Sequence, residues 1–418
     1  MSLPTTESAT TTTAEILSPY RWVMLTMAAC TSMLVYALPV LTLPVLFSEI
    51  AADLGLDLVQ IGMIWGITAV TGMFVVLIGG GIGDRIGTRR TLIGICVLAG
   101  ILGALRGFSN NFVTLLLTSL LFGMVAPALP VNLHKVAGQW FPRTQLSFAT
   151  GIVSTGFAMG LMTGSLLGAT LFSPLLGGWQ HLLFAYGVLS VLIGVLWIFV
   201  HPGDEQSLAA QRGVLPTPQP LGQTLRHVAS LRLVWMIGIG VFFFWSCVRG
   251  FVGYLPLYLR GAGWEPTQAD GALAAFYGIS LCFAMPFSIL SDRLQLRRGY
   301  LVLAALLLAT GVGLLGTVQG AWVWAAVLLG GIIFDAFMAI YQATVMEIPA
   351  VGRVYAGSAL GLAAMLREAG GIASPALGNS LSRFGPQVPF FFWAGLALVA
   401  ALIFWQLPQS FRDSEDHK

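Results

Sequence analysis

Charged side chains are scarce in this 418-residue chain: they make up 9% of the residues, whereas hydrophobic side chains make up 57%. A water-soluble domain has roughly a quarter of its residues charged. The mean hydropathy is +0.85, and the net charge is only +3. These values exclude an ordinary soluble domain, and they exclude a basic surface for nucleic acid as well.

Cysteine is rare too, and familiar catalytic patterns are missing. The four cysteines (Cys30, Cys96, Cys247 and Cys282) all lie in apolar stretches, and no two of them form a Cys-x-x-Cys pair. This argues against disulfides and against a metal site. The sequence also has no Ser-His-Asp arrangement, His-Glu-x-x-His motif or nucleotide-binding loop. We therefore expect neither an enzyme nor a bound cofactor.

What the chain does contain is a series of long apolar runs. A membrane-crossing helix needs about 20 such residues. On this rule the sequence predicts an all-α membrane protein with twelve spans, at 22–47, 60–80, 91–108, 112–133, 146–172, 182–200, 233–258, 270–290, 300–318, 321–344, 356–381 and 388–407.

Two similar basic loops follow the second and the eighth predicted span. Residues 80–90 read GGIGDRIGTRR and residues 288–298 read SILSDRLQLRR, about half a chain apart. A repeat at this distance indicates two related six-helix bundles. We predict a gating role for the loop residues Gly80, Asp84, Arg85, Gly87, Arg89, Arg90, Asp292, Arg293, Arg297 and Arg298. The alternative is that the arginines only mark the cytoplasmic side of the membrane.

This loop resembles the G-x-x-x-D-R-x-G-R-R hallmark of the major facilitator superfamily of secondary transporters. The element Trp140-Phe141-Pro142 after span four is similar to permeases of the cyanate and nitroimidazole type. Span seven, with Arg249 before Pro256, looks like the organic-anion branches. The resemblance implies a monomer that works by alternating access. It also implies a central cavity lined mainly by spans one, four, seven and ten.

The division of the chain follows from its linkers and cationic residues. We expect a disordered tail at 1–19, bundles at 20–200 and 233–407, a cytoplasmic linker at 201–232 and a cytoplasmic tail at 408–418. Of the arginines between spans, only Arg106, Arg260 and Arg383 fall outside if both termini are cytoplasmic. By the positive-inside rule this predicts a multi-pass protein of the inner or plasma membrane with both ends inside.

Arg249 is the leading candidate for substrate binding. An arginine at bilayer depth is costly and normally faces a cavity or a partner. It shares a helical stripe with Phe242 and Trp245, and Tyr36 of span one can complete the wall. A guanidinium grips a carboxylate through two hydrogen bonds. The resemblance to organophosphate carriers implies a partner arginine in span one, which this chain lacks, so we expect a small organic monoanion rather than a doubly charged phosphate ester.

Asp335 and Glu368 are the acids deep within predicted spans, and Arg367 adjoins Glu368. A carboxylate at this depth can carry a proton across the membrane, so we assign proton coupling to Glu368, Asp335 and Arg367. The alternative is a set of structural pairs, Arg249 with Asp335 and Arg367 with Glu368 or a backbone carbonyl. Neighbouring side chains leave a helix about 100° apart, so we do not expect Arg367 and Glu368 to pair. The further polar candidates are Asn132, Tyr341 and Gln342.

Small residues and prolines predict two details of packing. Gly156, Gly160, Gly164 and Gly168 form a ladder on span five. Such a ladder favours close packing, and we place it at the seam between the halves, which the resemblance assigns to spans two, five, eight and eleven. Pro127 and Pro130 are expected to bend span four.

The sequence favours proton-coupled uptake of a small organic anion, with the bilayer, the anion and the proton as partners. The alternative is proton-driven efflux of amphipathic or cationic compounds, with Asp335 and Glu368 as the cation site. A transporter-like membrane sensor signalling through the linker is a third reading.

Overall fold

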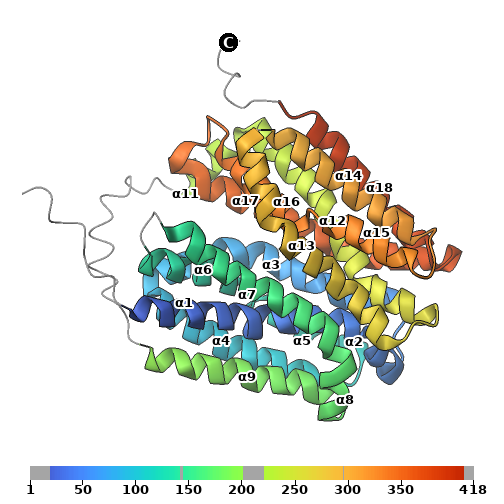
Figure 1. The fold of residues 1–418 in the computed structure, drawn as a ribbon. Coiled ribbons are helices and arrows are strands. Elements are labelled where there is room, and N and C mark those ends of the chain that lie inside the picture. Colours follow the sequence, from blue (N-terminus) through green and yellow to red (C-terminus); the bar gives the residue numbers. More distant parts are fainter. Residues whose placement is uncertain (1–18, 142–144, 201–220, 295, 409–418) are drawn as a thin grey trace, which may run out of the picture.

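The structure, a computed structural model, describes residues 19–141, 145–200, 221–294 and 296–408, with the backbone alone at 76–85, 147, 221–225, 292 and 352–354. The described part is helical throughout and contains no strand. Figure 1 shows two groups of helices, α1 to α9 in one and α11 to α18 in the other. The predicted tails and most of the linker lie outside the described residues.

The first group contains the first six spans. Its elements are α1 (Tyr20–Thr31), the π-helical η1 (Ser32–Ala37), α2 (Leu38–Leu54), α3 (Leu58–Ile86), α4 (Thr88–Leu105), η2 (Arg106–Phe108), α5 (Phe112–Gly123), α6 (Ala128–Trp140), α7 (Leu146–Leu167), η4 (Gly168–Phe172), α8 (Ser173–Leu176) and α9 (Trp179–Phe199).

The second group contains the last six spans and a short leading helix. Its elements are α11 (Leu221–Ser230), α12 (Arg232–Gly261), α13 (Pro266–Leu294), α14 (Arg297–Leu315), α15 (Trp322–Gly331), α16 (Phe334–Met346), α17 (Gly352–Ser380), η5 (Leu381–Phe384) and α18 (Val388–Trp405). The prediction of twelve membrane helices in two six-helix bundles is confirmed.

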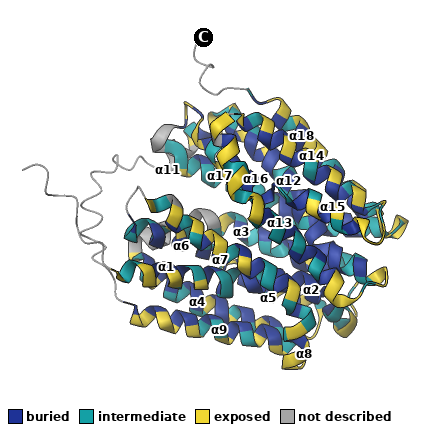
Figure 2. Ribbon diagram, in the orientation of Figure 1, coloured by how far each residue is buried: buried dark blue, intermediate teal, exposed yellow. Residues whose placement is uncertain are grey.

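Eleven stretches of the described helices are long and apolar enough to cross a membrane. The twelfth span is α17, whose 29 residues reach about 43 Å and so also suffice in length. It is less apolar than the others, since it carries Arg367 and Glu368. Figure 2 shows buried residues on the inward faces of the helices and exposed ones on the outside. The exposed side chains include large apolar ones such as Leu117, Leu192 and Leu402, as expected for a surface that faces lipid.

Span four and span ten are interrupted at similar places. Span four is α5 followed by α6, with a turn at 124–127 that ends in Pro127. Span ten is α15 followed by α16, with a break at Ile332 and Ile333. The prediction that prolines bend span four is confirmed. The matching interruptions also support the internal repeat that the two basic loops indicated.

The two groups meet along α3 with α17, and α7 with α13, so spans two, five, eight and eleven form the seam as predicted. Glycine lets the first pair approach closely: a Cβ on Gly62 would lie 2.7 Å from Ala376 Cα, and one on Gly66 would overlap the carbonyl oxygen of Ile372. At the end of the seam Asn379 Nδ2 donates to Leu58 O at 2.7 Å. The seam is therefore sealed at the end where α3 begins and α17 ends.

The glycine ladder of span five packs elsewhere than predicted. A Cβ on Gly156 would lie 2.6 Å from Ala29 O, and one on Gly164 would lie 2.5 Å from Leu38 O. Both partners belong to span one of the same group. The placement of the ladder at the seam between the halves is thus wrong, because the glycines fit against the backbone of a neighbour within their own bundle.

The seam generates a prediction about Gly66. In the variant Gly66→Ala the new methyl group meets the Ile372 carbonyl, so α3 and α17 must separate and the sealed form loses stability. We expect a lower midpoint of thermal unfolding in detergent. The matched control is Gly94→Ala on α4, whose Cβ would meet nothing within 4 Å. Equal midpoints for the two variants would contradict the close packing of this seam.

Candidate functional site

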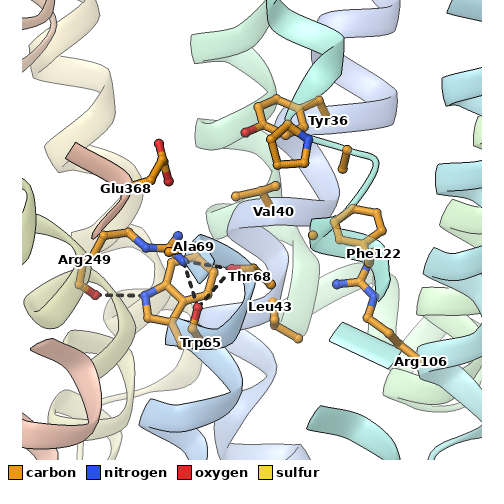
Figure 3. Close-up of a pocket in the computed structure, with 13 residues that line it drawn as sticks. Tyr36, Val40, Leu43, Trp65, Thr68, Ala69, Arg106, Phe122, Arg249 and Glu368 are labelled. Atoms are coloured by element: carbon orange, nitrogen blue, oxygen red, sulfur yellow. Dashed lines mark hydrogen bonds between the residues drawn. The ribbon is translucent and has the colours of Figure 1, made fainter. Parts of the chain in front are cut away.

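A cavity lies between the two groups of helices, beside the sealed part of the seam. It encloses about 470 Å³, part of it open to solvent. Its walls come from spans one, two, four, seven and eleven and from the end of span three (Figure 3). The lining residues are Tyr36, Val40, Leu43, Trp65, Thr68, Ala69, Arg106, Phe122, Gly123, Ala126, Pro127, Arg249 and Glu368.

Irregular backbone borders this cavity on two sides. Tyr36 lies on the π-helical segment η1, three residues before Pro39, which lacks a backbone N–H. Ala126 and Pro127 lie in the turn that interrupts span four. Non-helical backbone at membrane depth is tolerated where it lines a cavity or is covered by protein. π-Helical turns are also frequent at functional sites.

Arg249 lines one side of the cavity and joins the two halves. Its Nη2 donates to Trp65 O at 2.8 Å and to Thr68 Oγ1 at 3.0 Å. In return Trp65 Nε1 donates to Arg249 O at 2.8 Å, and the guanidinium lies 3.7 Å from the Trp65 ring centroid. We call this set of contacts among Arg249, Trp65 and Thr68 the clasp.

The clasp leaves the charge of Arg249 without a carboxylate partner. Among the described residues no acid forms an ion pair with it, and its Nε is buried without a hydrogen bond. The predicted alternative of an Arg249–Asp335 pair is not what the structure contains. Glu368 and Tyr36 line the same cavity as Arg249. The guanidinium is thus held by neutral groups and faces a cavity.

Arg367 and Glu368 form an ion pair, which corrects the expectation that they would not. Arg367 donates to Glu368 Oε1 from Nη2 at 2.6 Å and from Nε at 3.0 Å. Neighbouring side chains leave the helix about 100° apart, but the arginine side chain is long enough to reach back to Glu368. The same guanidinium lies 5.1 Å from the Trp245 ring centroid.

Trp245 and Phe242 were expected to wall the site, but neither lines this cavity. Trp245 stacks on Phe334 with ring centroids 6.0 Å apart, and its Nε1 is buried with no hydrogen-bond partner among the described residues. Phe242 contacts Phe243 edge to face and packs its backbone beneath Gly370. Of the predicted aromatic wall only Tyr36 lines the cavity, where it stacks on Phe157.

The four remaining polar candidates lie away from the cavity lining. Asp335 lies in the first turn of α16, just after the break of span ten, and its backbone N–H donates to Ser280 Oγ at 2.8 Å. Tyr341 is buried against Phe337, and Gln342 is exposed. Asn132 is fully buried and donates from Nδ2 to Ala128 O at 2.9 Å in its own helix.

Among the lining residues that the sequence analysis missed, Trp65 and Thr68 belong to the clasp, and Arg106 is charged. Trp65 carries no charge, and nothing in the pattern of span two singles it out. Arg106 was assigned to an outer loop, but it is only 2% exposed and lines the cavity. Its guanidinium lies 3.9 Å from the Phe122 ring centroid. In a sequence, an arginine at the end of an apolar run is indistinguishable from a loop residue. Here Arg106 begins η2 and lines the cavity.

The first basic loop fixes helix ends within its own half. Arg89 donates from Nε to Trp197 O at 3.0 Å and from Nη2 to Ile198 O, both at the end of α9. Gly87 ends α3 with a φ of 91°, a conformation that other residues rarely adopt. Arg90 is exposed. Only the backbone of Gly80, Asp84 and Arg85 is described, so their gating role stays a prediction.

The second basic loop also bonds within one half. Arg297 pairs with Glu347 at 2.8 Å, and its Nη1 donates to Ser291 Oγ at 3.1 Å. Arg298 lies over the Trp405 ring at 4.8 Å, while Arg293 is exposed. The side chain of Asp292 is not described. These contacts join the start of α14 to the ends of spans ten and twelve, and the gating role again stays a prediction.

The sequence matches the family model of the Major Facilitator Superfamily over residues 22–375. The chain belongs to the major facilitator superfamily. A likeness to a solved structure supports the same fold: the bacterial homologue of the human lysosomal transporter Spinster, in an inward-facing and unoccupied conformation, superposes with a TM-score of 0.77 at 15% identity. That match covers 93% of this chain and 97% of the other.

Two superfamily relatives are named as carriers of organic acids. The hexuronate transporter of Bacillus subtilis is 26% identical, with 84% of this chain and 86% of the relative aligned. A probable galactarate/D-glucarate transporter of Escherichia coli is 25% identical over 63% of this chain, and the match spans 64% of that relative's length. This superfamily member is thus a multi-pass membrane transporter rather than an enzyme, as predicted.

The clasp generates a prediction about Trp65. The variant Trp65→Ala removes the ring that the Arg249 guanidinium covers and the hydrogen bond from Trp65 Nε1 to Arg249 O. The cation–π contact alone is worth about 1–2 kcal/mol. We expect the cavity to open more often towards the Leu58 end. A cysteine in place of Leu43, with the four native cysteines replaced, should then react several-fold faster with an impermeant thiol reagent added on that side.

The control for this experiment is Trp22→Ala. Trp22 is 44% exposed, takes no part in the clasp and is not among the cavity-lining residues. It should leave the labelling rate unchanged. If Trp65→Ala labels no faster than Trp22→Ala, the clasp does not hold the two halves together.

Proposed function

We propose that this transporter takes up a small organic anion together with a proton, and that the anion binds Arg249. The observation that carries the proposal is a guanidinium in a cavity between the halves with no acidic partner among the described residues. A buried charge without a counter-charge is expensive, so the site favours an anionic guest. The organic acids named for the two relatives support this class of substrate.

Glu368 is our candidate for the proton carrier. It lines the same cavity as Arg249, and Arg367 donates a hydrogen bond to it. A proton on Glu368 removes a negative charge beside the anion site and so strengthens anion binding. By reciprocity a bound anion then favours the proton. Anion and proton would therefore enter together, which is symport.

Alternating access would use the seam and the clasp. With the cationic loops on the cytoplasmic side, the sealed Leu58–Asn379 end faces outward and the cavity opens inward. Outward opening would require the clasp and the Asn379 bond to break while residues 20–200 and 233–407 rock about the cavity, with 201–232 as the linker. Because the cavity forms within one chain, a monomer suffices.

The efflux alternative finds less support. It needs Asp335 and Glu368 to form a cation site together. Asp335 is not among the lining residues, and Glu368 is already paired with Arg367. An acid that is neutralised by an arginine has little charge left to attract a cationic drug.

The first prediction of this proposal concerns Arg249. Arg249→Lys keeps the charge but loses the planar fork that holds both a carboxylate and the clasp. We expect uptake of labelled organic acid to fall about tenfold or more with expression unchanged. The control Arg383→Lys, at an exposed position, should transport normally. Normal uptake by Arg249→Lys would place the anion site elsewhere.

The second prediction concerns Glu368. Glu368→Gln keeps the shape of the side chain but cannot release a proton. We expect this variant to lose accumulation driven by a pH gradient in proteoliposomes, while it still exchanges external for internal substrate. Glu265→Gln, at an exposed position, is the matched control and should accumulate normally. Retained uphill accumulation by Glu368→Gln would rule out this residue as the proton carrier.

A further inference from the structure

We propose that the substrate is a dianion, with one acidic group at Arg249 and the second at Arg106. This inference rests on the proposed function and names the class of anion more narrowly than the sequence did. The sequence predicts a monoanion because it places a single arginine in the cavity. The structure places two arginines in the lining of the same cavity, on opposite sides of it (Figure 3).

Arg106 is as buried as a structural arginine, but it lacks the carboxylate partner that a structural arginine normally has. It is 2% exposed, and among the described residues no carboxylate forms an ion pair with it. Its contacts are a long bond from Nε to Gly103 O at 3.4 Å and the face of the Phe122 ring at 3.9 Å. A carbonyl and an aromatic face only partly offset the cost of removing a full charge from water.

The local fold holds this arginine firmly in the lining. Arg106 begins the 3-10 turn η2, which turns the chain inward at the end of α4. The next residue, Gly107, packs so closely on α9 that a Cβ would lie 2.5 Å from Gln180 O. Ser109 Oγ and Thr118 Oγ1, 3.2 Å apart, tie the turn to α5. The guanidinium is therefore a fixed feature of the wall, as a binding group should be.

The wall between the two arginines is mostly apolar. Val40 and Leu43 of span one and Ala69 of span two lie there, with the Thr68 hydroxyl already bound to Arg249 (Figure 3). A hydrocarbon spacer suits such a wall, and acidic groups suit its two ends. While Glu368 is ionised, its pair with Arg367 is neutral, and the two lining guanidiniums leave the cavity with two uncompensated positive charges. The symported proton on Glu368 adds a third positive charge. A dianion therefore offsets more of the cavity charge than a monoanion does in either protonation state.

The test compares acids that share a carbon skeleton and differ by one carboxylate. Purified full-length protein is titrated at neutral pH with adipate and hexanoate, and then with terephthalate and benzoate. We expect the dianion of at least one pair to bind at least tenfold more tightly than its monoanion. Arg106→Gln should weaken binding of the dianion about tenfold more than binding of the monoanion, and so abolish that preference. Arg383→Gln, at an exposed site, should keep the wild-type ratio.

Arg106→Lys guards against a variant that fails to fold, since it keeps the charge and should keep part of the preference. The proposal is overturned if the wild-type protein binds each monoanion as tightly as its dianion. It is also overturned if Arg106→Gln lowers the unfolding temperature but leaves the ratio unchanged, because Arg106 would then be structural. Failure of the proposed function gives a different result, namely no binding or flux of either member of any pair.

Discussion

The structure depends on one constraint: a positive charge in the middle of a membrane protein must be solvated by something other than water. Arg249 meets this constraint by reaching from span seven to the backbone and hydroxyl of span two and by covering the face of Trp65. Solvating one residue thereby holds the two halves together. Because these groups are neutral, they hold the guanidinium without cancelling its charge, and the site keeps its attraction for anions.

The helices that surround this charge are interrupted where the cavity needs room. Span one contains a π-helical segment at Ser32–Ala37, and span four turns before Ala128. Span ten breaks at the matching position, and just after the break the backbone N–H of Asp335 donates to Ser280 Oγ, outside the cavity lining. The repeat therefore supplies similar backbone irregularities in both halves. Only the first half uses its break to shape the wall described here.

The sequence predicted the parts of the fold that composition controls. The twelve spans follow from apolar length, and the seam follows from the family resemblance. Arg249 and Glu368 stood out because charges inside apolar spans are rare, and Tyr36 because the resemblance places span one at the cavity; all three line it. Arg106 was wrongly predicted to lie in an outer loop, since an arginine at the end of an apolar run gives no sign of whether the chain then turns towards the cavity or towards solvent. The glycine ladder predicts a smooth helix face for close packing, but the spacing of glycines in one helix does not show which other helix packs against that face.

In the proposed cycle the clasp has a kinetic consequence. An incoming substrate can exchange its own oxygens for those of Trp65 and Thr68, so a loaded carrier loses little when the halves part. An unloaded carrier must expose the bare guanidinium at the same step. Reorientation without cargo would then be the slowest event, internal substrate would accelerate entry of external substrate, and slippage through empty carriers would be suppressed.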